Sequence, residues 1–285
     1  MYLLKHLIFS IPFLLSTSLY AQEPDEQTIV AEGFRLYKSE MASWYGTDLF
    51  LEHFSGKKEQ AEGYFSYTEA EENRCLFFSR GNDPKVLVTF IFDDTFNTQT
   101  ARIDTTERVF TPQERDLYLI RKKALTQINQ DTLFKKYQNT SLNLIPVVDK
   151  YSRKVYVLTG PQKQGVVIIG NDYLLTFDEN NLLVSQKPLH KNIIPIDYAK
   201  DTTGVITMHT HLPETGGTIT PTDICTLLLY QKYAHWQQHY VVSQTYVSIW
   251  DCASNKLVIL TKEAWDRIEK HQDEKKKKQK KKREK

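Results

Sequence analysis

The residue types best suited to chemistry lie between positions 207 and 224, in the segment TMHTHLPETGGTITPTDI. His209 and His211 are separated by one residue, and Asp223 follows twelve positions after the second histidine. Side chains at i and i+2 of a β-strand point to the same face, so both imidazoles can face one point. Imidazole and carboxylate are donors that zinc accepts. The spacing predicts that His209, His211 and Asp223 hold a single divalent ion, zinc, with a fourth position open for water.

The same aspartate also has a purely structural interpretation. Thr220 and Asp223 form the ends of a Thr-x-x-Asp capping box, in which the acid accepts a hydrogen bond from an unpaired backbone N–H. The chain has a similar box in TPQE at 111–114, where no histidine is near in the sequence. Asp223 alone therefore indicates little. More specific is the combination of a strand with both histidines, a glycine-containing turn and a Thr-x-x-Asp that begins a helix.

This combination resembles the motif of the JAMM (JAB1/MPN) metalloproteases, which is His-x-His, a short loop and then Ser-x-x-Asp. Residues 209–211 match the first part, Thr220 stands at the serine, and Asp223 matches the aspartate. The resemblance covers residues 155–270. It implies a JAB1/MPN-like domain with a mixed sheet flanked by helices, in which a zinc-bound water attacks a peptide or isopeptide carbonyl.

Three positions depart from the family pattern. Leu212 separates the second histidine from the proline that follows it directly in the family. Thr220 keeps the hydroxyl of the family serine, so the resemblance assigns it contact with the oxyanion. Gln162, in QKQGVVIIG, stands where the family has a glutamate general base. Glutamine cannot take this role at neutral pH, and loss of a general base costs on the order of 10²–10⁴ in rate. Carboxylates that could replace it, outside the family pattern, are Asp172, Glu179 and Glu214.

Two hypotheses of different classes follow. The first is an exported zinc-dependent peptidase or isopeptidase that acts on a protein or peptide substrate. The second is a catalytically inactive JAMM-like module that serves as a binding or scaffold domain of the cell envelope. Gln162 argues against activity, and the sequence leaves the enzyme question open.

The remaining histidines of the C-terminal half carry weaker signals. His235 and His239 fall around the end of an expected helix, where surface or interface positions are typical. His190 lies in the strand-rich half and can approach the metal site, but a partly buried, hydrogen-bonded histidine is favoured. The C-terminal half contains no glycine-rich phosphate loop that opens a helix. It also lacks a nucleophile elbow for serine catalysis.

The elements that must position the site are strands and one helix. Residues 155–190 contain apolar runs separated by Gly, Asn and Pro, which is typical of strands. GVITMHTH at 204–211 predicts a further strand, 221–236 a helix, and 239–251 and 256–261 more strands, with a closing helix at 262–270.

The N-terminal part predicts a mixture of helix and strand. Helical spacing in 33–54 gives a helix, with core candidates Leu36, Met41, Trp44, Leu49 and Phe50. The segment 63–80 predicts a hairpin, 85–93 a buried strand and 100–110 a half-exposed strand. TPQE opens a helix at 111, and two strands follow around DKYSR.

The 285-residue chain therefore predicts an α+β fold with four segments. They are a signal peptide at 1–21, an N-terminal α+β region at 22–150, a JAMM-like domain at 151–270 and a disordered lysine-rich tail at 271–285. The basic start, apolar run and Ala21 are typical of a secretory signal, which predicts a periplasmic or secreted protein.

The charge of the C-terminal tail narrows the choice of partners. The last thirteen residues hold nine Lys or Arg against three acids, so the rest of the chain is net negative. Such a tail can contact anionic surfaces. It has no aromatic residue to stack bases, so nucleic acid is not expected.

The three cysteines are too few for a disulfide framework, and their disulfide state is left open. They are Cys75, Cys225 and Cys252.

Overall fold

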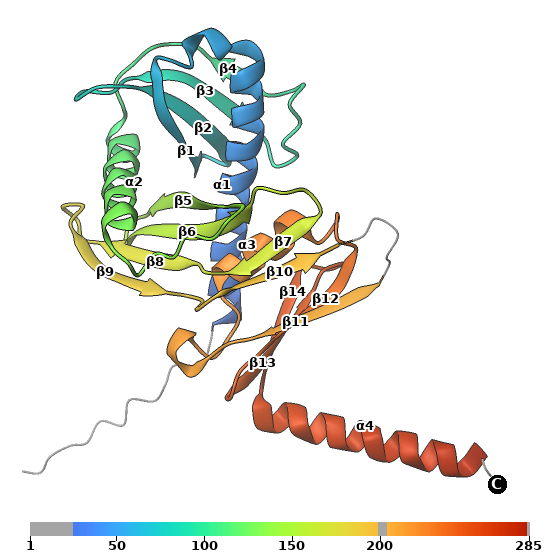
Figure 1. The fold of residues 1–285 in the computed structure, drawn as a ribbon. Helices are drawn as coiled ribbons and strands as arrows, with labels where there is room; N and C mark the ends of the chain where they lie inside the picture. Colours follow the sequence, from blue (N-terminus) through green and yellow to red (C-terminus); the bar gives the residue numbers. More distant parts are fainter. Residues whose placement is uncertain (1–24, 199–203, 284–285) are drawn as a thin grey trace, which may run out of the picture.

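A computed structural model describes residues 25–198 and 204–283 and has a mixed α+β fold (Figure 1). Four α-helices and four β-sheets make up this part of the chain. The predicted signal peptide, 1–21, lies outside the described residues. No described helix has both the length and the hydropathy of a membrane-spanning segment.

The long helix α1 (Glu26–His53) connects the N-terminal sheet to the C-terminal half. Asp25 caps it by accepting hydrogen bonds from the backbone N–H groups of Gln27 and Thr28. Leu36, Leu49 and Phe50 are buried as predicted, and Met41 is partly buried. Trp44 is predicted in the core but is 48% exposed, with its ring centroid 6.4 Å from that of Tyr230.

The N-terminal sheet is an antiparallel meander in the order β1-β2-β3-β4. Its strands are β1 (Ala61–Glu69), β2 (Glu72–Ser79), β3 (Val86–Phe92) and β4 (Arg102–Asp104). The hairpin and the buried strand are confirmed, whereas the strand predicted at 100–110 is only three residues long in β4. Phe77 and Phe90 pack against α1, and Phe78 packs against α2 (Pro112–Gln130).

A second antiparallel sheet has the order β5-β6-β8-β9 and packs against α2. Its strands are β5 (Thr140–Val148), β6 (Arg153–Pro161), β8 (Tyr173–Phe177) and β9 (Leu183–Pro188). The boundary predicted between 150 and 151 falls in the turn of the β5–β6 hairpin, whose strands pair from Thr140–Pro161 to Val148–Arg153. The chain therefore crosses this position within one sheet and not through a linker.

The C-terminal sheet contains the strand with the two histidines. Its order is β11 (Val205–Thr210), β12 (Trp236–Val242), β13 (Tyr246–Asp251) and β14 (Lys256–Thr261). β11 and β12 are parallel and are joined through α3 (Pro221–Tyr230), and the other pairs are antiparallel. A two-stranded sheet of β7 (Val166–Gly170) and β10 (Ile193–Asp197) shares a core with α3 and the C-terminal sheet.

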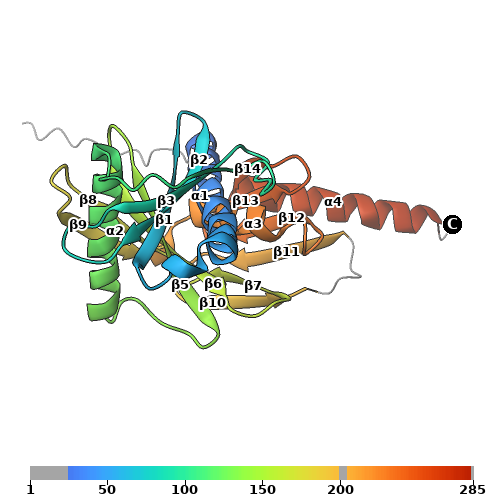
Figure 2. The ribbon, with the colours of Figure 1, turned by 90° about the horizontal axis from the view of Figure 1, so that it is seen from above.

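Helix α4 (Lys262–Arg283) extends away from the body of the molecule (Figures 1 and 2). Its first turns are the predicted closing helix. The lysine-rich segment predicted as a disordered tail is described as a continuation of this helix, up to Arg283. Lysine and glutamate are good helix formers, so the helix continues although its side chains there are exposed.

Candidate metal centre

The two predicted histidines are brought together by the pleat of β11. His209 is the last but one residue of the strand, and the backbone N–H of His211 extends the pairing by donating to the Val242 carbonyl, at 3.0 Å. Both side chains therefore face the same side of the sheet. Their Nε2 atoms are 3.0 Å apart. The sequence prediction that the two imidazoles face one point is confirmed.

Asp223 at the start of α3 combines the two roles that the sequence left open. The capping box is present, because Asp223 Oδ2 accepts hydrogen bonds from the N–H and the hydroxyl of Thr220, at 2.9 and 2.8 Å. The other oxygen, Oδ1, is directed at the histidines and lies 3.4 Å from His209 Nε2. Oδ1 is buried and makes no hydrogen bond. The cap thus fixes the carboxylate with one oxygen free for a further partner.

A third histidine completes the cluster. His190 lies between β9 and β10, and its Nε2 is 3.0 Å from His211 Nε2 and 3.1 Å from Asp223 Oδ1. One donor atom from each of His190, His209, His211 and Asp223 lies within 4.8 Å of all the others, and all four residues are buried. This cluster could hold a metal ion. A tetrahedral shell with bonds of about 2.0–2.1 Å has donors about 3.3 Å apart. Four donor pairs are close to this value, at 3.0–3.4 Å: His209–His211, His190–His211, His190–Asp223 and His209–Asp223.

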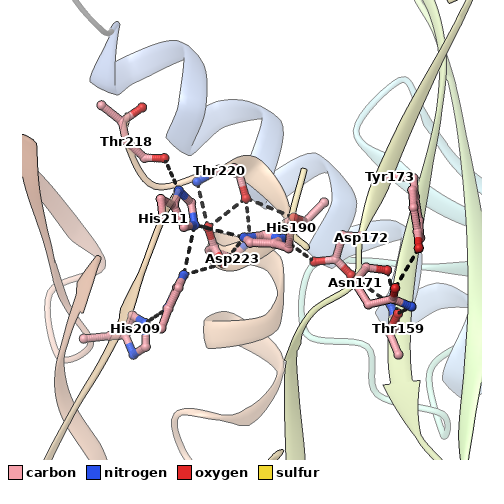
Figure 3. A network of polar contacts seen from close by, with 12 residues as sticks. Thr159, Asn171, Asp172, Tyr173, His190, His209, His211, Thr218, Thr220 and Asp223 are labelled. Atoms are coloured by element: carbon pink, nitrogen blue, oxygen red, sulfur yellow. Dashed lines mark hydrogen bonds and ion pairs between the residues drawn. The ribbon is translucent and has the colours of Figure 1, made fainter. Parts of the chain in front are cut away.

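The outer nitrogens of His211 and His190 have polar neighbours, the Thr218 carbonyl and Asp172 (Figure 3). His211 Nδ1 lies 2.9 Å from the Thr218 carbonyl, which can only accept, so this nitrogen carries the proton. His190 Nδ1 lies 3.2 Å from an oxygen of Asp172. The proton on the outer nitrogen leaves the Nε2 lone pair of a neutral imidazole directed into the cluster. Such outer partners are typical of histidines that bind metal.

The outer partner of His209 is another histidine. His209 Nδ1 is 2.8 Å from His239 Nε2, and His239 Nδ1 is 2.7 Å from the Thr207 hydroxyl. His239 is fully buried, so its predicted surface position is wrong. The reason is that the helix ends at Tyr230 and His239 belongs to β12, beside β11. His235 is exposed, as expected.

Electrostatics favour a cation at the centre of the cluster. Burial lowers the pKa of His209 to about 3, so this imidazole is neutral at pH 7. Burial also acts against the charged form of His190, but Asp223 and Asp172 outweigh it and raise the pKa of His190 to about 10. The carboxyl of Asp223 is buried, yet His190 and His209 hold its pKa well below the ordinary value. The anionic, lone-pair-rich cluster thus needs a positive charge, which a proton on His190 or a bound metal ion supplies.

The other candidate residues lie at varying distance from this cluster. Thr220 is buried beside it, but its hydroxyl donates to Asp223 and serves the cap. Gln162 is exposed in the connection between β6 and β7, and its backbone N–H donates to the Asn139 carbonyl. Glu179 is exposed, and Glu214 is exposed and pairs with Lys191. Asp172 contacts the cluster, through His190.

The donor set fits zinc by its chemistry: three imidazoles and one carboxylate are ordinary ligands of this ion in four-coordinate sites. Sequence reasoning did not place His190 among the ligands, because it lies 21 residues before His211 with no motif connecting the two. Comparisons of this chain with family models, with curated proteins and with solved structures gave no match.

Proposed function

We propose that this chain is a zinc-binding protein of the JAMM type, in which His190, His209, His211 and Asp223 hold one ion as a closed, four-ligand centre. The supporting observation is that Nε2 of His190 lies 3.0 Å from His211 Nε2 and 3.1 Å from Asp223 Oδ1, so that it can serve as a fourth donor. Structural zinc sites use four protein ligands, whereas hydrolytic sites use three and keep the fourth position for water.

A closed centre assigns the ion a role in holding the fold. The ligands come from three separate parts of the chain: β11 and its extension, the start of α3, and the connection between β9 and β10. Zinc bound there would join these parts, and its binding free energy would add to the stability of the folded state. The absence of a carboxylate at Gln162 agrees with this role. The proposal corresponds to the inactive binding or scaffold module, exported to the periplasm or secreted.

A second candidate is the zinc-dependent peptidase or isopeptidase. The observation in its favour is that His209, His211 and Asp223 are the three-ligand set that the resemblance to JAMM enzymes implies. In that case His190 would leave the donor set to open the fourth position. Asp172 would be the acid closest to the site, through its contact with His190.

Hydrolysis assays on zinc-loaded protein separate the two candidates. The zinc-loaded wild type is expected to leave panels of fluorogenic peptides and isopeptide-linked conjugates intact, while its melting temperature falls when a chelator removes the ion. The matched variant is His211→Ala, which lacks one donor. Turnover of any substrate by the wild type that disappears in His211→Ala would refute the closed centre and favour the peptidase.

A further inference from the structure

A cavity that shares no residue with the metal cluster lies between α1, α2 and the facing edge strands of two sheets. The edge strands are β1 and β5, the first members of their sheets, and Figure 1 shows α1 and α2 beside them. The cavity has a volume of about 400 Å³ and is also lined by Leu229 and Tyr230 at the end of α3. Pockets of this size hold small organic molecules.

Arg121 of α2 lines this cavity and has no counter-ion in the described part of the chain. Its Nε atom is buried and makes no hydrogen bond. A guanidinium stays charged and carries five N–H donors in a fixed fork. Removing such a charge from water without a partner is unfavourable. An anion in the cavity would remove this cost, and a carboxylate fits the fork with two parallel hydrogen bonds.

Two acids line the cavity, Glu40 and Asp48, and neither forms an ion pair with Arg121. Glu40 of α1 accepts a hydrogen bond from Asn143 Nδ2, at 3.0 Å, and it forms no ion pair with Arg121. Burial raises the pKa of Glu40 to about 7, so a large fraction of this group is neutral at physiological pH. A neutral carboxyl both donates and accepts hydrogen bonds. Glu40 and Asn143 therefore offer the cavity a polar wall, and the carboxylate of Asp48 lines it at an exposed position.

Aromatic rings supply the apolar part of the lining. Trp44 and Tyr230 lie with ring centroids 6.4 Å apart and an interplanar angle of 57°, and Tyr64 lines the cavity as well. Trp44 is 48% exposed, so part of its ring is accessible to a ligand. A few convergent polar groups among aromatic side chains are the usual composition of a ligand pocket.

We propose that this cavity binds a small organic acid, whose carboxylate pairs with Arg121 and whose apolar body lies against Trp44 and Tyr64. The inference does not rest on the metal centre, because the cavity and the cluster have no residue in common. It assigns the chain a small-molecule site with a preference for carboxylates over their neutral amides.

The test compares N-acetyl-L-phenylalanine with its C-terminal amide, which differs in charge but hardly in shape. Binding to the full chain is measured by calorimetry and by tryptophan fluorescence. The acid is expected to bind at least about tenfold more tightly than the amide. Arg121→Met is expected to abolish that preference, while Arg115→Met, at an exposed arginine of the same helix, leaves it unchanged.

Thermal unfolding of Arg121→Met separates a binding role from a structural one. Because the substitution removes a partly buried charge that has no counter-ion, the ligand-free variant is expected to melt at or above the wild-type temperature. A variant that melts well below the wild type would mean that the guanidinium holds the fold, and the proposal would be wrong. Equal binding of acid and amide, or no saturable binding of either at millimolar concentration, would overturn it as well.

Discussion

His239 offers a sharp test of the metal centre, because it contacts a ligand but not the site of the ion itself. Its Nε2 is 2.8 Å from His209 Nδ1, which must carry the proton if Nε2 of His209 is to bind metal. Replacing His239 with Phe keeps a buried ring and removes the acceptor for His209, together with the contact to the Thr207 hydroxyl. The Nδ1–H of His209 is then left without a partner in a buried position.

The expected magnitude follows from that lost contact. Removing an outer partner of a metal-binding histidine typically weakens metal affinity about 10- to 100-fold. This corresponds to about 1.4–2.7 kcal/mol of binding free energy. The same change leaves a buried donor unsatisfied in the metal-free protein, which costs about 1–3 kcal/mol of the free energy of unfolding. Both effects act through His209, so His239→Phe should change metal affinity without changing the number of ligands.

The assay is competition for zinc with a chromophoric chelator of known affinity. His239→Phe should bind zinc at the same stoichiometry as the wild type but more weakly. His209→Ala, which lacks the ligand itself, gives the zinc affinity expected when this donor is lost completely. His271→Phe makes the same substitution at an exposed histidine of α4 and should bind like the wild type. If His239→Phe and the wild type have the same zinc affinity within about twofold, the account of the outer partners fails.

Two further predictions concern α1. A Cβ at Gly33 would lie 2.5 Å from Ile224, the residue next to Asp223, so Gly33→Ala should displace α3, weaken zinc binding and lower the free energy of unfolding. Overpacking costs about 1–3 kcal/mol of the free energy of unfolding, which urea unfolding measures. The control is Gly56→Ala, which should be nearly neutral because no atom lies within 4 Å of the added Cβ. Equal losses of stability in the two variants would contradict the contact between Gly33 and Ile224. Burial raises the pKa of Glu40 to about 7 in the folded state, so its contribution to stability is lost as pH rises from about 4.5 to 7. Glu40→Gln should reduce the difference in unfolding free energy between pH 5 and pH 8, and an unchanged difference would contradict the burial of this carboxyl.

The local elements of the site could be predicted from the sequence. The alternation in β11 placed His209 and His211 on one face, and the capping box placed Asp223 at the start of a helix. These patterns are set by residues close together in the chain. The approach of Asp223 to the histidines was less strongly indicated, because the Pro/Gly turn between them allows the chain to fold back but does not set its path.

The remaining contacts of the site depend on long-range packing. His190 reaches the cluster because β10 pairs with β7, which brings the preceding residues beside α3. The sequence places His239 just after a helix at 221–236, at the start of a strand, but α3 ends at Tyr230 and β12 begins at Trp236, after the left-handed backbone of His235 at φ 52°. Strand β12 then aligns His239 with Thr207 of β11. Neither contact has a signal in sequence spacing.

The most direct test of the metal centre is elemental analysis of the purified wild type beside His190→Ala and His211→Ala. The account predicts about one zinc per chain in the wild type, none in His211→Ala, and a more weakly held ion in His190→Ala. His235→Asn, at an exposed histidine with a left-handed backbone, should retain the wild-type content. A wild type without zinc after purification and reloading, or a His211→Ala variant with the same zinc content as the wild type, would contradict the central claim.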